Sequence, residues 1–212
     1  MTRTLIAVLL VAGITFSAAA IVYRKKEPHK TSKPSPVNPA RSASLILQSK
    51  AALMKNYLRN SGYNEEVCFF INMGMASGKK RFFVYNLKTG TIITSGLVAH
   101  GSGGGSTFDT PEYSNKTGSN CTSLGKYKIG QSYHGQFGLA YKLHGLEKTN
   151  SNAFNRFVVL HAHECVPDND IYPDNICMSW GCPTVSPGFL KQLAAQIDKS
   201  EKPILLEIYE EQ

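Results

Sequence analysis

The sequence predicts one mainly-β domain with a helix at each end. Short runs rich in β-branched and aromatic residues follow residue 67 and are bounded by turn residues, which is typical of strands. The clearest pair, 81–86 and 91–97, flanks a four-residue loop that ends in Gly90 and predicts a hairpin. Further strands are expected at 68–71, 126–129, 157–160 and 204–209.

Helical spacing of apolar residues marks the two ends of this region. In the first helix, Ser42 is the expected N-cap, and Ile46, Leu53 and Tyr57 form one apolar face that ends near residues 60–62. In the second, Ser186 is the expected N-cap and Pro187 lies in the first turn. The apolar face of that helix consists of Leu190, Leu193, Ala194 and Ile197.

The domain is preceded by two segments of different composition. Residues 4–23 are apolar or small and are long enough to cross a hydrocarbon core of ~30 Å, so residues 1–26 are a membrane anchor or, with a cleavage site at 18–20, a signal peptide. Residues 27–41 hold four of the ten prolines and predict an extended linker. The catalytic-domain candidate is then 42–212, and the chain is expected to be exported to the periplasm or cell envelope.

The formal charge of +8 is concentrated at the N-terminus. Residues 1–50 contain eight Lys or Arg against one Glu, and the remainder is nearly neutral. Because no basic patch interleaved with aromatic residues is visible after residue 50, nucleic acid is not an expected partner.

A histidine and a cysteine stand where acyl-transfer chemistry needs them. His161 ends the predicted strand 157–160, and residues 179–184 read Ser-Trp-Gly-Cys-Pro-Thr just before the second helix. A cysteine nucleophile needs a base for its proton and backbone N–H groups for the oxyanion. Cys182 is therefore the candidate nucleophile and His161 the base. A side chain at Gly181 would crowd the acyl group, and the helix N-terminus would lower the thiol pKa.

These residues resemble the bacterial L,D-transpeptidases, the YkuD-type catalytic domain. The likeness rests on His161 and Ser179-Trp180-Gly181-Cys182, and is closer to a subfamily with a Ser-Trp-Gly-Cys-Pro signature. It extends through 81–90, 97–101 and 122–129, and covers most of 45–210. The common form has Gly after the histidine, where this chain has Ala162, and His where this chain has Trp180.

The resemblance implies a β-sandwich-like fold and a peptidoglycan L,D-transpeptidase without metal or organic cofactor. Peptidoglycan stem peptides are the implied partners, with an amine acceptor or, for L,D-carboxypeptidase activity, water. It also assigns supporting roles: Ser179, Trp180 and Gly181 surround the oxyanion, and the Ala162 carbonyl orients His161. Substrate contacts are expected from a loop over 130–145 and near the base, at Tyr133, Tyr141, His144 and His163; an ordinary surface loop is the alternative reading.

The other four cysteines form an even set, which suggests disulfides in an exported chain. Cys165 and Cys177 bracket a Pro- and Asp-rich insertion and are the expected bridge, with Cys68 and Cys121 either bridged or buried apart. Zinc is the competing interpretation for a cluster of His and Cys, but the spacings fit no standard zinc pattern.

Three alternative interpretations of the same residues stay open from the sequence alone. Cys182 could be a small buried hydrophobe, and the domain could be a noncatalytic wall-binding module. Another thiol hydrolase of papain type is a third possibility, although that class has the cysteine before the histidine.

Overall fold

The computed structural model describes residues 39–211. The predicted anchor or signal peptide at 1–26, and most of the predicted linker at 27–41, lie outside the described residues. Within 39–211, no helix combines the length and the apolar character that a membrane span requires.

Nine strands and two helices make up this part of the chain, and the mainly-β prediction with a helix at each end is confirmed. The helices are α1 (Pro39–Leu58) and α2 (Pro187–Lys199). The strands are β1 (Val67–Asn72), β2 (Phe82–Asn86), β3 (Thr91–Gly96), β4 (Val98–Ala99), β5 (Gly125–Gly135), β6 (Gly138–Gly145), β7 (Val159–Ala162), β8 (Thr184–Val185) and β9 (Leu205–Tyr209).

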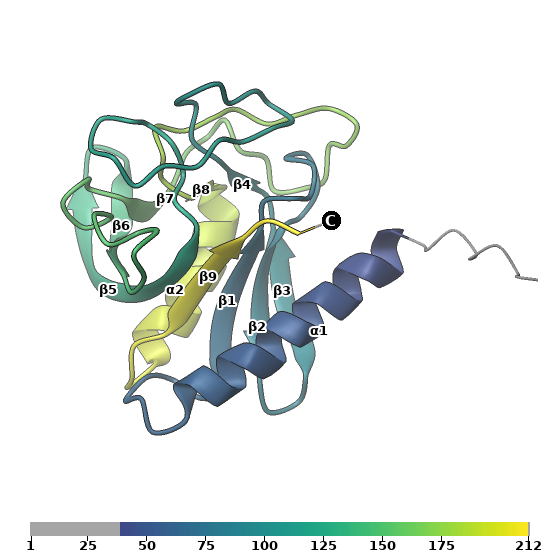
Figure 1. Ribbon diagram of the computed structural model, residues 1–212, viewed down its shortest axis with the longest axis vertical. Helices are drawn as coiled ribbons and strands as arrows, with labels where there is room; N and C mark the ends of the chain where they lie inside the picture. Colours follow the sequence, from purple (N-terminus) through teal and green to yellow (C-terminus); the bar gives the residue numbers. More distant parts are fainter. Residues whose placement is uncertain (1–38, 212) are drawn as a thin grey trace, which may run out of the picture. The chain divides into compact units, whose positions relative to one another are not determined.

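The strands form one sheet in the order β3-β2-β1-β9-β5-β6-β7-β8-β4. Most neighbours are antiparallel, but β1 pairs with β9 and β7 pairs with β8 in parallel. The long strand β5 joins the two halves, because residues 125–128 pair with β9 and residues from 127 onward pair with β6. Figure 1 shows the sheet curling at β5 and β6, with α1 across one side of β1, β2 and β9 and α2 behind the sheet.

Two cores hold the sheet and helices together. The larger lies between the sheet and α2 and includes Phe69, Phe82 and Leu160, with Phe189 of α2 packed edge-on against Phe82. The smaller lies under α1 and includes Phe70 and Leu205. Burying each such side chain stabilises the fold by about 1.5–3 kcal/mol. Because side chains alternate along a strand, Phe69 and Phe70 of β1 lie on opposite faces of the sheet, one in each core.

The apolar face of α1 differs from the prediction. The buried positions are Leu47, Ala51, Met54 and Leu58, whereas Leu53 and Tyr57 are exposed and Ile46 is half-buried. The helix also begins at Pro39, before the predicted cap at Ser42 and inside the predicted linker. Several overlapping stripes at helical spacing exist in this segment, and packing on Phe70 and Tyr209 selects one of them.

The glycine-rich stretch 130–145, expected to be a loop, forms most of the β5–β6 hairpin instead. Glycines at its tip allow the tight turn, since Gly138 has φ +75°. The predicted second helix, by contrast, has the expected cap: the Ser186 hydroxyl accepts a hydrogen bond from the Phe189 amide at 3.1 Å.

Candidate active site

His161 lies in β7, between β6 and β8, with its ring largely buried. Its Cα is paired with Thr184 of the parallel neighbour β8 and with Ala140 of β6. Partners in register have side chains on the same face of a sheet. This register brings the Thr184 hydroxyl within 3.0 Å of His161 Nε2.

The hydrogen bonds of the ring define which nitrogen can act as a base. His161 Nδ1 lies 3.1 Å from the Ala162 carbonyl oxygen, which can only accept, so Nδ1 carries the proton. Nε2 of the neutral ring then carries the lone pair, which can accept from the Thr184 hydroxyl. That hydroxyl can instead donate to the Cys182 carbonyl at 3.4 Å, which leaves Nε2 unoccupied. Burial lowers the pKa of His161, opposed by the Ala162 hydrogen bond and reinforced by His163. The neutral, proton-accepting form therefore persists at neutral pH.

Cys182 is half-buried beside the start of β7. Its sulfur accepts a hydrogen bond from the Val159 amide at 3.4 Å, and its thiol lies 3.7 Å from the Phe157 carbonyl. Burial raises the pKa of Cys182, while the Val159 amide and the Arg156 charge act to lower it. α2 begins five residues later at Pro187, and the effect of its N-terminus on the thiol pKa stays a prediction.

The turn around the nucleophile is closed by Ser179. The Ser179 hydroxyl donates to the Cys182 carbonyl at 2.6 Å and accepts from the Gly181 amide at 3.2 Å. The amides of Trp180 and Cys182 have no hydrogen-bond acceptor among the described residues. These two amides, rather than that of Gly181, are the ones available to an oxyanion.

The backbone around Gly181 requires a glycine at this position. It has φ +107°, which L side chains rarely adopt, and a Cβ there would lie 2.8 Å from the Cys121 carbonyl oxygen. This close approach is to the protein backbone, and the crowding of an acyl group stays a prediction. Trp180, next to Gly181, is 80% exposed.

Arg156 is a site residue that the sequence analysis missed. Its guanidinium donates to the carbonyls of Ser114 and Cys121 at 2.8 and 2.6 Å, and to the hydroxyls of Ser123 and Ser119. It thus fixes the segment 114–123 beneath the catalytic turn and places a positive charge near the thiol. No local pattern marks a lone arginine in a turn as functional, and only the fold reveals it.

Exposed aromatic side chains surround the two catalytic candidates. Phe137, at the tip of the β5–β6 hairpin, stacks on the His161 ring with centroids 4.9 Å apart. Phe157 is 83% exposed although its carbonyl reaches Cys182. A hollow of about 420 Å³ lies on the base side, lined by Phe137 together with Ala162, His163 and Lys191.

Of the four predicted substrate contacts, three line the surface and one does not. Tyr133 is exposed, His163 lines the hollow on the base side and His144 lines a second hollow. Tyr141, contrary to the prediction, is buried, and its hydroxyl donates to the Asp198 carboxylate of α2 at 2.9 Å. Alternation along β6 turns Tyr141 into the core.

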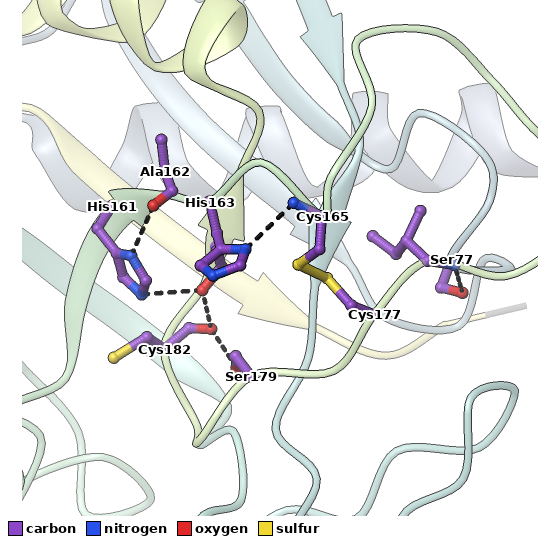
Figure 2. The surroundings of a disulfide bond; sticks show 10 residues. Ser77, His161, Ala162, His163, Cys165, Cys177, Ser179 and Cys182 are labelled. Atoms are coloured by element: carbon purple, nitrogen blue, oxygen red, sulfur yellow. Dashed lines mark hydrogen bonds between the residues drawn. A yellow bond between two sulfur atoms is a disulfide. The ribbon is translucent and has the colours of Figure 1, made fainter. Parts of the chain in front are cut away.

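Cys165 and Cys177 form a disulfide in the structure, with Cα atoms 6.0 Å apart. Figure 2 shows His163 between this disulfide and His161, and the Cys165 amide donates to His163 Nδ1 at 3.1 Å. Cys68 and Cys121 are free and buried. No group of three or more His, Cys, Asp or Glu within 39–211 could hold a metal ion.

A family model described as an L,D-transpeptidase catalytic domain matches residues 40–205. The chain belongs to this L,D-transpeptidase family. A search of the curated proteins found no significant match.

Solved structures show more distant likenesses to this L,D-transpeptidase chain. The helical cell shape determining protein Pgp2 of Campylobacter jejuni (K307A mutant) is 12% identical, with TM-score 0.43; the match covers 80% of this chain and 57% of that one. The Ldtfm–avibactam carbamoyl enzyme is 10% identical, with TM-score 0.43 and coverages of 70% and 51%. Mycobacterium tuberculosis L,D-transpeptidase 1 is 13% identical, with TM-score 0.34 and coverages of 68% and 62%. The chain spans about half the length of the first solved proteins it matches.

Proposed function

We propose that this chain is an exported peptidoglycan L,D-transpeptidase that works through a Cys182 thioester. The observation that supports this most is a half-buried thiol, in the turn before β8, beside β7, which carries a base of defined tautomer. His161 Nδ1–H is held by the Ala162 carbonyl, so Nε2 is the nitrogen whose lone pair can take a proton once the Thr184 hydroxyl donates elsewhere. Family membership supplies the reaction class.

Acylation begins with the loss of the thiol proton to His161 Nε2. In the structure no hydrogen bond joins Cys182 to His161, and the thiol points to the Phe157 carbonyl. The thiol must turn from Phe157 toward Nε2, and such tightening on substrate binding is common. The thiolate then attacks the carbonyl of the third, L-centred residue of a tetrapeptide stem.

The tetrahedral oxyanion is held by the free amides of Trp180 and Cys182. Its collapse breaks the bond to the terminal D-Ala, whose nitrogen takes the proton from His161 and leaves. A thioester remains on Cys182. An amine of a second stem attacks next, gives its proton to Nε2, and releases the thiolate as the cross-link forms.

Water in place of the amine would give an L,D-carboxypeptidase. Export is supported by the Cys165–Cys177 disulfide, since such bonds persist in oxidising compartments. The apolar segment 4–23, outside the described residues, would serve as anchor or signal.

The test is incubation of the purified chain with a synthetic tetrapeptide, with and without an amine-bearing stem, followed by mass spectrometry. Wild type should release D-Ala. Its own mass should increase by the mass of the donor peptide minus the mass of D-Ala. Cys182→Ala should lose both while keeping its melting temperature. A folded wild-type chain that forms no adduct and releases no D-Ala would instead favour a noncatalytic wall-binding module.

A further inference from the structure

A basic hollow lies beside the nucleophile, on the side away from the base. Its volume is about 560 Å³, and it is formed by β5, β6, the 146–157 connection and the segment after α2. Three lysines and a histidine contribute to its lining, together with one acidic residue: Lys128, Lys142, Lys202, His144 and Glu201.

The lysines of this hollow form no ion pairs among the described residues, and Glu201 is the one carboxylate in its lining. No Asp or Glu oxygen of the described residues comes within 4.0 Å of Lys128, Lys142 or Lys202. By contrast, the neighbouring Lys126 contacts Glu147 at 2.9 Å. Lys128 and Lys142 also act with burial to lower the pKa of His144, so the ring stays neutral between them. An anion is the chemical class that this arrangement fits.

An aromatic wall limits the hollow on one side. The rings of His144 and Phe154 stack with centroids 4.7 Å apart, and Lys142 Nζ lies 5.8 Å from the Phe154 ring. Such a wall excludes water from one flank of a bound group and strengthens its interaction with the lysines.

Two backbone connections link this hollow to the catalytic thiol. Lys142 of β6 is in register with Val159 of β7, whose amide donates to Cys182 Sγ. Phe154 begins the tight turn whose last residue, Phe157, places its carbonyl against the same sulfur. The hollow and the nucleophile therefore share their supporting backbone.

We propose that this hollow is a subsite for the side-chain carboxylate of the acyl-donor peptide, a proposal that rests on the function proposed above. The distance from β6, which carries Lys142, to β8, which follows Cys182, is two strand spacings, or roughly 10 Å. Two or three extended residues cover that distance at ~3.3–3.6 Å each. The matching carboxylate belongs to an acidic residue upstream of the reacting carbonyl, because only one residue follows that carbonyl in a tetrapeptide.

The donor rather than the acceptor occupies this hollow, because of the positions of the catalytic groups. The acceptor amine must reach His161 Nε2, and the hollow of about 420 Å³ with His163 and Ala162 lies on that side. The basic hollow is instead lined by Lys142 and Phe154. Lys142 is the register partner of Val159, and Phe154 begins the turn to Phe157; Val159 and Phe157 contact the sulfur to which the donor is attached.

Isothermal titration of the full chain carrying Cys182→Ala tests the subsite without turnover. The probes are a tetrapeptide with a free acidic side chain, its side-chain amide and its C-terminal amide. The Lys128→Gln/Lys142→Gln variant should bind the free acid about tenfold more weakly and the side-chain amide unchanged, since solvent screening limits each half-buried lysine to a few-fold effect. Lys55→Gln, on the exposed surface of α1, is the matched control and should change neither.

Three results would overturn the subsite. They are equal loss of the acid and the side-chain amide, a loss specific to the C-terminal carboxylate, and no detectable binding of the acidic peptide. D-Ala release by wild type separately tests the proposed function. If wild type releases D-Ala and the double lysine variant has an unchanged KM, the subsite is refuted and the proposed function is not. If the acidic peptide binds in a lysine-dependent way but no D-Ala is released, the transpeptidase reaction is refuted and the carboxylate site stands.

Discussion

Removing the Cys165–Cys177 disulfide should destabilise the domain by about 3 kcal/mol. The change is the double substitution Cys165→Ala/Cys177→Ala, which avoids leaving a single reactive thiol. The bridge joins residues 12 apart in sequence, so a 13-residue ring is opened. The chain-entropy relation gives about 2.9 kcal/mol for a ring of this size.

The ring is anchored to the rest of the domain, so its opening should affect global unfolding. Val166 and Ile176 are buried with Leu97 and Ala99, which lead into the 100–107 segment. The Ile171 amide also donates to the Gly78 carbonyl at 2.9 Å. For a domain of this length, 1 kcal/mol shifts the melting temperature by ~2–4 °C, so a decrease of about 6–12 °C is expected.

The assay is thermal unfolding by circular dichroism, with and without reductant. Reductant should lower the melting temperature of wild type and leave the double variant unchanged. Cys182→Ala is the matched control, because it removes a thiol that forms no bridge and should respond to reductant as wild type does. A double variant that melts within 2 °C of wild type would refute the reasoning and show that the ring unfolds independently.

Three further outcomes are expected. His161→Ala should reduce kcat/KM by about 10²–10⁴ while His163→Ala costs far less; the reverse order in steady-state assays would assign the base to His163. Arg156→Met should raise the thiol pKa of Cys182, seen as an alkaline shift in the pH profile of iodoacetamide labelling, and Arg156→Lys should restore part of it; an unshifted profile with Met would refute the electrostatic role. Burial and Arg81 lower the pKa of His100 below 6.5, so at acid pH the unfolded chain binds a proton at this residue more readily than the folded chain does. The free energy of unfolding, measured in urea, should therefore decrease as the pH falls below about 6.5. Equal values at about pH 7.5 and pH 5 would contradict this.

The sequence by itself determined the class of the fold and pointed to the two candidate catalytic residues. Strand runs with turn residues between them, and helical spacing at each end, depend on local periodicity, which tertiary contacts seldom reverse. Cys182 and His161 could be selected because their chemistry requires specific residue types in a recognisable order. The Cys165–Cys177 pairing was likewise accessible, since the two residues bracket a single polar insertion.

The tertiary structure decided everything that depends on packing and register. The face of α1 was mispredicted because Leu47 and Met54 compete with Leu53 and Tyr57, and only the contact with the sheet separates them. The glycines of residues 130–145 led to the prediction of a loop where the β5–β6 hairpin forms. The orientation of Tyr141 into the core was therefore mispredicted as well.

The same holds for the groups that tune the site. Thr184 reaches the base only because β7 and β8 run parallel in one register, and Arg156 reaches the catalytic turn only through the fold. The basic hollow gathers lysines from β5, β6 and the segment after α2, which lie far apart in the chain. Long-range pairing creates these neighbours, and no local pattern of residues encodes them.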